Sequence, residues 1–259
     1  MPDKPSTLVK SKKTLSLKLL TGGILFIGLS FFSGVIKTSY IDRESHQNYQ
    51  LAPYPSAYND AIIQIYAART RGTKRAFAVH SWIAYKKEGA SDYIVSQVIG
   101  WRLRSYGTTL FSQPGIPDDD WAGNPPTLLL DLRGPKAEEL IPQIESAIDE
   151  YPYASRYTVW PGPNSNTFIS WVGRQVPELG VDLPTMAIGK DWRPINESIG
   201  ISPSGTGVQA SLFGLLGLSA GIEEGLELNI LSLNVELDLF DLAIEVPGYG
   251  RIGKAQVSK

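Results

Sequence analysis

The stretch from Tyr157 to Leu179, YTVWPGPNSNTFISWVGRQVPEL, constrains the fold more than any other part of the chain. Its apolar start predicts a short strand, and Pro161-Gly162-Pro163 predicts a turn. Asn164 is a favourable helix N-cap, because its side-chain oxygen can accept a hydrogen bond from an amide of the first turn. Since the residue before Pro177 is disfavoured in the helical conformation, the sequence predicts a helix over residues 165–176.

This helix has one buried stripe, which Ser165 begins. The stripe continues at positions i+3, i+4, i+7 and i+11 with Phe168, Ile169, Val172 and Val176. The Ser165 hydroxyl is therefore expected among the free amides at the positive end of the helix dipole. That position suits a nucleophile, and it equally suits an ordinary capping serine.

The residue composition excludes several kinds of site. The chain has 259 residues, no cysteine and two histidines, His46 and His80. Disulfides, thiolate zinc sites and a cysteine nucleophile are excluded, and so is a histidine-rich metal centre, whereas a carboxylate-only site stays open. We expect no metal and no cofactor. With a net charge of −2 and no basic stripe, we expect no nucleic-acid partner either.

The first 58 residues divide into three segments. Residues 1–18 are basic, residues 19–36 (LLTGGILFIGLSFFSGVI) carry no charge, and residues 37–58 read as a polar stalk. Eighteen uncharged residues reach the lower limit for a membrane-spanning helix. A cleaved secretory signal is the alternative, but no small-x-small cleavage site follows. The sequence thus predicts a single-pass anchor in the inner (plasma) membrane, with a cytoplasmic amino terminus, an extracytoplasmic body and the lipid bilayer as partner.

Residues 59–193 read as an α+β core, in which antiparallel strands precede helices. Two apolar runs predict a hairpin, and a third strand follows them. A loop rich in proline and aspartate, a buried strand and an amphipathic helix containing Pro142 come before the 165–176 helix. We expect that helix to cover the sheet. The corresponding ranges are 61–68 and 76–87 for the hairpin, 92–103 for the third strand, 113–126 for the loop, 127–132 for the buried strand and 137–151 for the helix.

Residues 194–259 differ in character and predict an acidic, β-rich extension. Residues 194–250 contain eight acids and no lysine or arginine. Residues 211–222 are too short to span a bilayer, and predict a buried or interfacial helix. Residues 226–246 alternate apolar and polar or acidic positions, which is typical of half-exposed strands. We expect the acidic side of these strands to face solvent.

His80 is the only histidine within a predicted strand. One interpretation makes it a general base for Ser165, because a serine hydroxyl needs such a partner to act as a nucleophile at neutral pH. The other interpretation is a histidine hydrogen-bonded inside the core.

From about Ala61 to Trp192 the chain resembles the bacterial family called domain of unknown function 3750. The matching stretches are AVHSWIA, IGWR, GNPP, LLDLRG, YPYASRY, WPGPNSNTF and AIGKDW. The resemblance covers roughly half of the chain, and the family brings no established reaction.

A more distant resemblance does imply a reaction. A strand histidine followed by a nucleophile that opens a helix is similar to the circularly permuted papain-like enzymes of the NlpC and lecithin-retinol-acyltransferase type. The resemblance implies His80 as base and Asn164-Ser165-Asn166 as the nucleophile turn, with serine in place of the family's cysteine. The Ser165 amide and the Asn166 side chain would stabilise an oxyanion, and Tyr157 and Trp160 would line the site. Gln97, Asp92 and Asp131 are candidates for orienting His80 by polarity.

Two functions follow as hypotheses. The first is a membrane-anchored, papain-like serine hydrolase or acyltransferase that acts on an amide or ester of an envelope small molecule or peptide. The alternative keeps the fold without the reaction, as a binding or scaffold module of the envelope in which Ser165 is a helix cap.

Overall fold

The structure, a computed structural model, describes residues 49–239 and 241–253. The predicted basic terminus, the predicted membrane segment and residues 37–48 of the predicted stalk lie outside these residues. Among the residues described, no helix combines the length and the apolar character that crossing a bilayer requires.

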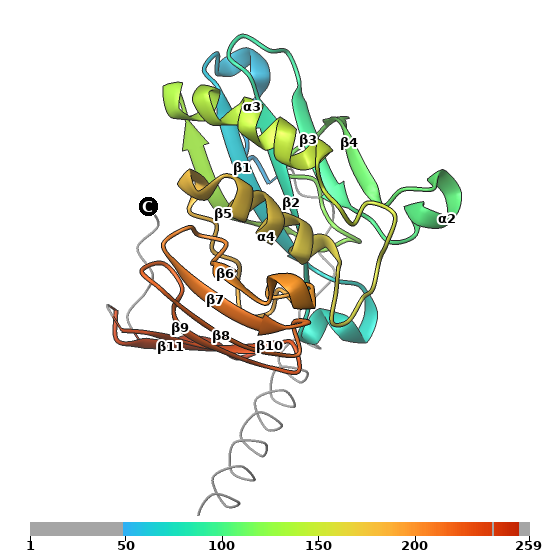
Figure 1. Ribbon diagram of the computed structural model, residues 1–259. Helices are drawn as coiled ribbons and strands as arrows, with labels where there is room; N and C mark the ends of the chain where they lie inside the picture. The colour runs from blue at the N-terminus through green and yellow to red at the C-terminus, as the bar shows by residue number, and fades with distance from the viewer. Residues whose placement is uncertain (1–48, 240, 254–259) are drawn as a thin grey trace, which may run out of the picture.

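The first layer is a five-stranded antiparallel sheet with the order β4-β3-β2-β1-β5. Two helices cover one face of it (Figure 1). The predicted hairpin is confirmed as β1 and β2, and the α+β class is confirmed with it. The bounds are β1 Ile62–Arg69, β2 Val79–Lys86, β3 Tyr93–Val98, β4 Leu110–Gly115, β5 Pro126–Arg133, α3 Pro135–Asp149 and α4 Ser165–Gln175.

Helix α4 begins at the predicted Ser165 and ends at Gln175, one residue before the predicted end, with Val176 as its C-cap. The Asn164 side chain accepts hydrogen bonds from the Asn166 and Thr167 amides, and the Thr167 side chain closes a capping box. Phe168, Ile169 and Val172 are fully buried against the sheet, together with apolar residues of α3. Pro142 lies inside α3, which begins at Pro135.

Three predicted details are wrong. The third strand ends at Val98, and a short helix, α2 (Arg102–Tyr106), follows. Residues 157–160 form a loop, closed by a hydrogen bond from the Thr158 amide to the Pro163 carbonyl at 2.8 Å. The beginning of the predicted 113–126 loop is the end of β4, which pairs with β3.

The face of the first sheet opposite the helices is also covered. A smaller apolar cluster of Tyr66, Ala68, Trp82, Ala84 and Val95 lies there under the loop after β4. The end of the predicted stalk packs on the same side, because Asp118 accepts a hydrogen bond from the Leu51 amide at 2.8 Å. Residues 49–58 therefore belong to the folded body. The short 3₁₀ helices are Pro55–Ala57, Gly72–Ala76, Pro177–Leu179 and Ile195–Glu197.

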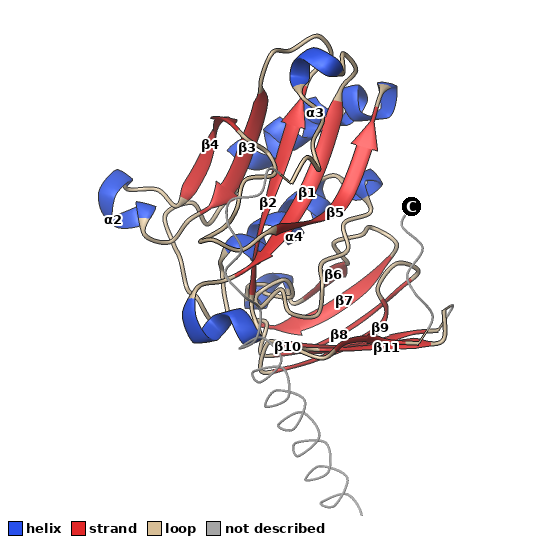
Figure 2. Ribbon diagram, turned by 180° about the vertical axis from the view of Figure 1, so that it is seen from behind, coloured by secondary structure: helices blue, strands red, loops and turns tan. Residues whose placement is uncertain are grey.

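The second layer is a seven-stranded antiparallel sheet built from consecutive hairpins. It lies beyond α4, at one end of the first layer (Figures 1 and 2). The predicted 211–222 helix is wrong, since a turn at Phe213–Leu215 divides this stretch between two paired strands. The bounds are β6 Ile199–Ile201, β7 Gly207–Leu212, β8 Leu216–Gly221, β9 Gly225–Ile230, β10 Leu233–Asp238, β11 Ala243–Val246 and β12 Gly250–Ile252.

The alternation in this sheet is as predicted, but its two faces are reversed. Glu227 and Glu236, expected in solvent, are 2% and 4% exposed. Their apolar neighbours Leu226, Leu228 and Leu237 are at least 40% exposed. The buried face is polar because it packs on charged and polar groups of the segment after α4, which are described below.

Candidate functional site

The turn that opens α4 ties three parts of the chain together. Asn164 Nδ2 donates to the carbonyls of Val159 and Ile188, at 3.2 and 2.9 Å. Asn166 Nδ2 donates to the carbonyls of Val79 and Ile188, at 3.1 and 2.8 Å. The Asn166 amide group is therefore fully engaged within the protein, and it is not free to stabilise an oxyanion.

The segment 187–192, AIGKDW, lies directly against this turn. Thr167 Oγ1 donates to the Gly189 carbonyl at 2.8 Å. Gly189 has a positive φ of 91°, and a Cβ atom there would lie 2.5 Å from the Asn164 side chain. Two of the stretches that carry the family resemblance, WPGPNSNTF and AIGKDW, are thus joined by hydrogen bonds and close packing.

Ser165 is 3% exposed and lies at the first position of α4. The Ser81 hydroxyl donates its one proton to Asn166 Oδ1 at 2.8 Å, and the Ser165 carbonyl oxygen lies 3.5 Å from the same hydroxyl. No hydrogen bond of the Ser165 hydroxyl itself occurs among the described residues. Within the described part of the chain, no base is hydrogen-bonded to this hydroxyl.

His80 is a buried histidine with satisfied contacts. Its Nε2 is 2.8 Å from Gln97 Oε1, and since that oxygen can only accept, Nε2 carries the proton. The Trp121 ring stacks on the imidazole with centroids 3.5 Å apart. Burial lowers the pKa of His80 from 6.5 to about 4, against the smaller raising effect of the Gln97 hydrogen bond. His80 is therefore neutral at pH 7.

The structure does not bring His80 and Ser165 together. Successive side chains of a strand point to opposite faces, so His80 and Ser81 leave β2 on different sides. Ser81 contacts the turn of α4, whereas His80 contacts Gln97 and Trp121 on the side away from the helices. The sheet itself lies between the imidazole and the Ser165 hydroxyl.

The other sequence-predicted residues lie apart from each other. Of the three candidates for orienting His80, only Gln97 contacts it. Asp131 lies two strands away and pairs with Arg133 at 2.7 Å, while Asp92 accepts a hydrogen bond from Ser91 at a distant pocket.

Neither aromatic candidate lies beside a catalytic pair. The Tyr157 ring lies against Gly100. Trp160 is 49% exposed, and its Nε1 donates to the Leu231 carbonyl of the second sheet at 3.0 Å.

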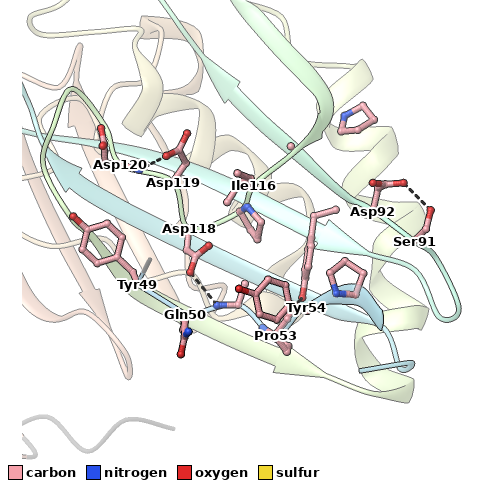
Figure 3. A pocket seen from close by; sticks show the side chains of 16 residues that line it. Tyr49, Gln50, Pro53, Tyr54, Ser91, Asp92, Ile116, Asp118, Asp119 and Asp120 are labelled. Carbon is pink, nitrogen blue, oxygen red and sulfur yellow. Dashed lines mark hydrogen bonds between the residues drawn. The ribbon is translucent and has the colours of Figure 1, made fainter. Parts of the chain in front are cut away.

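A pocket of about 780 Å³ opens on the side of the first sheet that is free of helices (Figure 3). Its walls are residues 49–55, the start of β3 and the loop after β4. Asp118 and Tyr93 hold the first of these walls, because Asp118 accepts from the Leu51 amide and the Tyr93 hydroxyl donates to the Pro53 carbonyl at 2.9 Å. Sequence analysis missed this site, since its walls are far apart in the chain.

The lining of the pocket is acidic and aromatic. Asp92, Asp118, Asp119 and Asp120 line it together with three tyrosines and four prolines. Among the described residues, no lysine, arginine or histidine lines it. Asp119 and Asp92 are exposed, whereas Asp118 is buried. Within the described part of the chain, no group of three or more histidine, aspartate or glutamate side chains could hold a metal ion.

A second cluster that sequence analysis missed joins the two layers. Asp191 accepts from Gln209 and Asn229 at 2.6 Å and from Asn234 at 2.7 Å. Lys190 pairs with Glu227 at 2.7 Å, and both are almost completely buried. The signal available in the sequence was the pair of adjacent charges in AIGKDW, beside strands rich in asparagine and glutamate.

This cluster shifts several pKa values. Burial tends to lower the pKa of Lys190, but the neighbouring Glu227, Asp191 and Asp182 carboxylates raise it above its ordinary value overall. Burial and nearby carboxylates, Asp182 first, raise the pKa of Glu236 to about 8. A protonated Glu236 at pH 7 explains how a glutamate can lie in this layer beside other acids.

Comparison with protein-family models gave one match. The model described as "Protein of unknown function (DUF3750)" matches residues 60–192, about half of the chain. No curated protein matched, and no solved structure matched.

Proposed function

The chain belongs to the DUF3750 family, and from its geometry we propose that it is a membrane-anchored binding module of the cell envelope. The acidic, tyrosine-lined pocket takes a ligand with positive charge and some apolar surface. The observation that carries this proposal is the lining itself, which contains four carboxylates and, within residues 49–239 and 241–253, no basic group.

The chemistry of the pocket supports a cationic ligand. Aspartates at its two sides attract ammonium or guanidinium groups, and tyrosine faces bind cations through their ring electrons. Its volume lies in the range of small-molecule sites and holds a few residues of a peptide. The same carboxylates would repel an anionic ligand.

The membrane part of the proposal rests on the sequence. The uncharged residues 19–36 and the lysines before them support an anchor in the inner membrane, with the body outside the cytoplasm. The anchor would keep the pocket close to the envelope surface.

The rival hypothesis is a permuted papain-like serine hydrolase or acyltransferase. It requires His80 to reach Ser165, and the present arrangement would have to rearrange across a buried sheet to allow this. Binding without catalysis needs no such rearrangement, because the polar side chains of the α4 turn already form hydrogen bonds that hold neighbouring segments together.

Titration calorimetry with the full chain in detergent micelles tests the proposal. Pentalysine is the probe and pentaglutamate is its matched control. We expect pentalysine to bind, with an affinity that falls as salt is added, and pentaglutamate not to bind.

The pocket variants are Asp92→Asn and Asp119→Asn, and the control is Asp149→Asn on α3. Each pocket variant is expected to weaken binding by roughly tenfold, about 1.4 kcal/mol, and the control to leave it unchanged. Equal weakening by the control, or no preference between the two peptides, would overturn the proposal.

A further inference from the structure

The outer face of the second sheet is wholly apolar across seven strands. Cross-strand pairs align its members, as in Val208 with Ala220, Leu218 with Leu228 and Leu237 with Ile244. No charged or hydrogen-bonding side chain interrupts it. This apolar face consists of Ile199, Ile201, Val208, Ala210, Leu212, Leu216, Leu218, Ala220, Leu226, Leu228, Ile230, Leu233, Val235, Leu237, Ile244 and Ile252.

The orientation of the sheet is fixed from its other side. Asp191 binds three amide side chains of the inner face, and Glu227 pairs with Lys190. Turning the sheet over would leave these groups unpaired. With six strand spacings of about 4.8 Å and strands of about 17 Å, the apolar face has a flat footprint of roughly 500 Å². Contiguous exposed apolar patches of this extent are typical of interaction surfaces.

We propose that the apolar face lies on a lipid bilayer, at the boundary between headgroups and acyl chains. The inference rests on the membrane anchor of the proposed function, and it adds a second point of contact. Twelve residues, 37–48, separate the anchor from Tyr49, and they span at most about 40 Å when fully extended. The body is therefore held within reach of the bilayer.

A second copy of the chain fits this surface less well. A typical protein–protein interface carries about ten direct hydrogen bonds. Among the described residues, the apolar face presents no side-chain donor or acceptor that would form them or fix the register of a partner. Acyl chains require neither.

The turns at the two ends of the strands differ in a way that suits contact with a membrane–water interface. The turns at 213–215, 231–232 and 247–249 carry no charge, and they expose Phe213, Leu231 and Tyr249. Trp160 adds an indole that donates to the Leu231 carbonyl. The turns at the opposite ends of the strands carry Glu223, the buried Glu224, and Asp241, which pairs with Arg251. Because aromatic residues favour the membrane–water interface, we expect the end of the sheet with the charge-free turns to lie deeper in the bilayer than the other end.

The charge pattern also predicts the kind of lipid. In the described part of the second sheet the one basic residue is Arg251, which pairs with Asp238 and Asp241, so contact does not depend on anionic headgroups. Vesicles of phosphatidylcholine alone are sufficient, and salt has little effect.

Fluorescence with single cysteines tests the inference, since the chain has no cysteine of its own. The full chain is reconstituted in phosphatidylcholine vesicles, with the environment-sensitive dye NBD at Leu218→Cys. Gln143→Cys, exposed on α3, is the control. We expect nitroxide-labelled lipids to quench the dye at position 218 severalfold more than at 143. We also expect stronger quenching at Phe213→Cys than at Ile222→Cys.

Two results would overturn the inference. In the first, the dye at position 218 is quenched by aqueous iodide and not by lipid nitroxides, as at position 143. In the second, Leu218→Cys chains form disulfide-linked dimers on oxidation while lipid quenching is absent, which identifies a second copy as the occupant. Extraction with alkaline carbonate reports separately on the anchor, so loss of the anchor and failure of the apolar face give different results.

Discussion

The side chains of His80 and Ser165 lie on opposite faces of the five-stranded sheet. His80 donates to Gln97 and stacks on Trp121, while Ser165 begins a helix on the other face. The residues that suggest a catalytic pair therefore belong to two separate structural clusters. What the sheet leaves open on the His80 side is the acidic pocket, which contains neither residue.

The hydrogen bonds of the Asn166 side chain predict that replacing this residue strongly destabilises the protein. Asn166→Ala removes a side chain that binds Val79, Ile188 and Ser81, and it leaves these groups unpaired in the interior. We expect a loss of about 2–3 kcal/mol in the free energy of unfolding, measured by urea denaturation of the full chain in micelles. Ser165→Ala is the control and should change it by no more than about 1 kcal/mol. A larger effect from Ser165→Ala would contradict this role.

The close approach at Gly189 predicts a difference between two glycines. Gly189 and Gly180 both have positive φ, but only a Cβ at Gly189 would meet a neighbour, Asn164. Both alanine variants should therefore lose stability through strain, and Gly189→Ala should lose about 1–3 kcal/mol more because of overpacking. Similar midpoints for the two variants in thermal unfolding would show that the turn is not tightly packed against residues 187–192.

The buried Glu236 predicts a dependence of stability on pH. Its pKa rises from 4.5 to about 8 on folding, so between these values the folded chain holds a proton that the unfolded chain has lost. Stability then falls as pH increases, by up to about 1.4 kcal/mol per pH unit. His80 has the opposite effect below pH 6.5, and Asp182 acts below about pH 6. Burial also raises the pKa of Glu227, which acts in the same direction as Glu236, so the contribution of Glu236 is the difference between the parent and a variant that lacks this carboxyl.

Glu236→Gln isolates this contribution. Between pH 6.5 and pH 8 the variant should lose clearly less stability in urea unfolding than the parent does. A parent whose stability is flat over this window would mean that Glu236 is ionised in the folded chain.

The environment of His80 predicts an unusually low pKa for its imidazole. Its imidazole should stay neutral down to about pH 4, because burial opposes the charged form. Proton NMR of the ring can measure this directly, since the chain has only one other histidine, His46, and His46→Gln assigns the signals. A midpoint near 6.5 would place the ring in contact with water, as a general base requires.

Helix and strand positions could be predicted from the sequence better than the face of a sheet on which each side chain lies. Asn164 as N-cap and Pro177 as helix breaker determine the two ends of α4 through local interactions, and the structure confirms both roles. For β2 every residue from His80 to Lys86 is buried, so no polar alternation revealed which side His80 takes. In the second sheet the alternation was visible, but alternation alone does not say which face is covered.

The acidic pocket and the Asp191 cluster were beyond sequence reasoning for another reason. Each gathers residues from segments tens of positions apart, as with Leu51 and Asp118 or Asp191 and Asn234. No local periodicity encodes such meetings, and they depend on how the two layers pack.

Labelling of the full chain in micelles with a fluorophosphonate, followed by peptide mass spectrometry, tests the central claim most directly. A serine without an adjacent base reacts poorly with this reagent, so the account predicts no adduct on Ser165 and no difference between the parent and His80→Ala. Stoichiometric labelling of Ser165 that is lost in His80→Ala would contradict it, and would establish the two residues as a working catalytic pair.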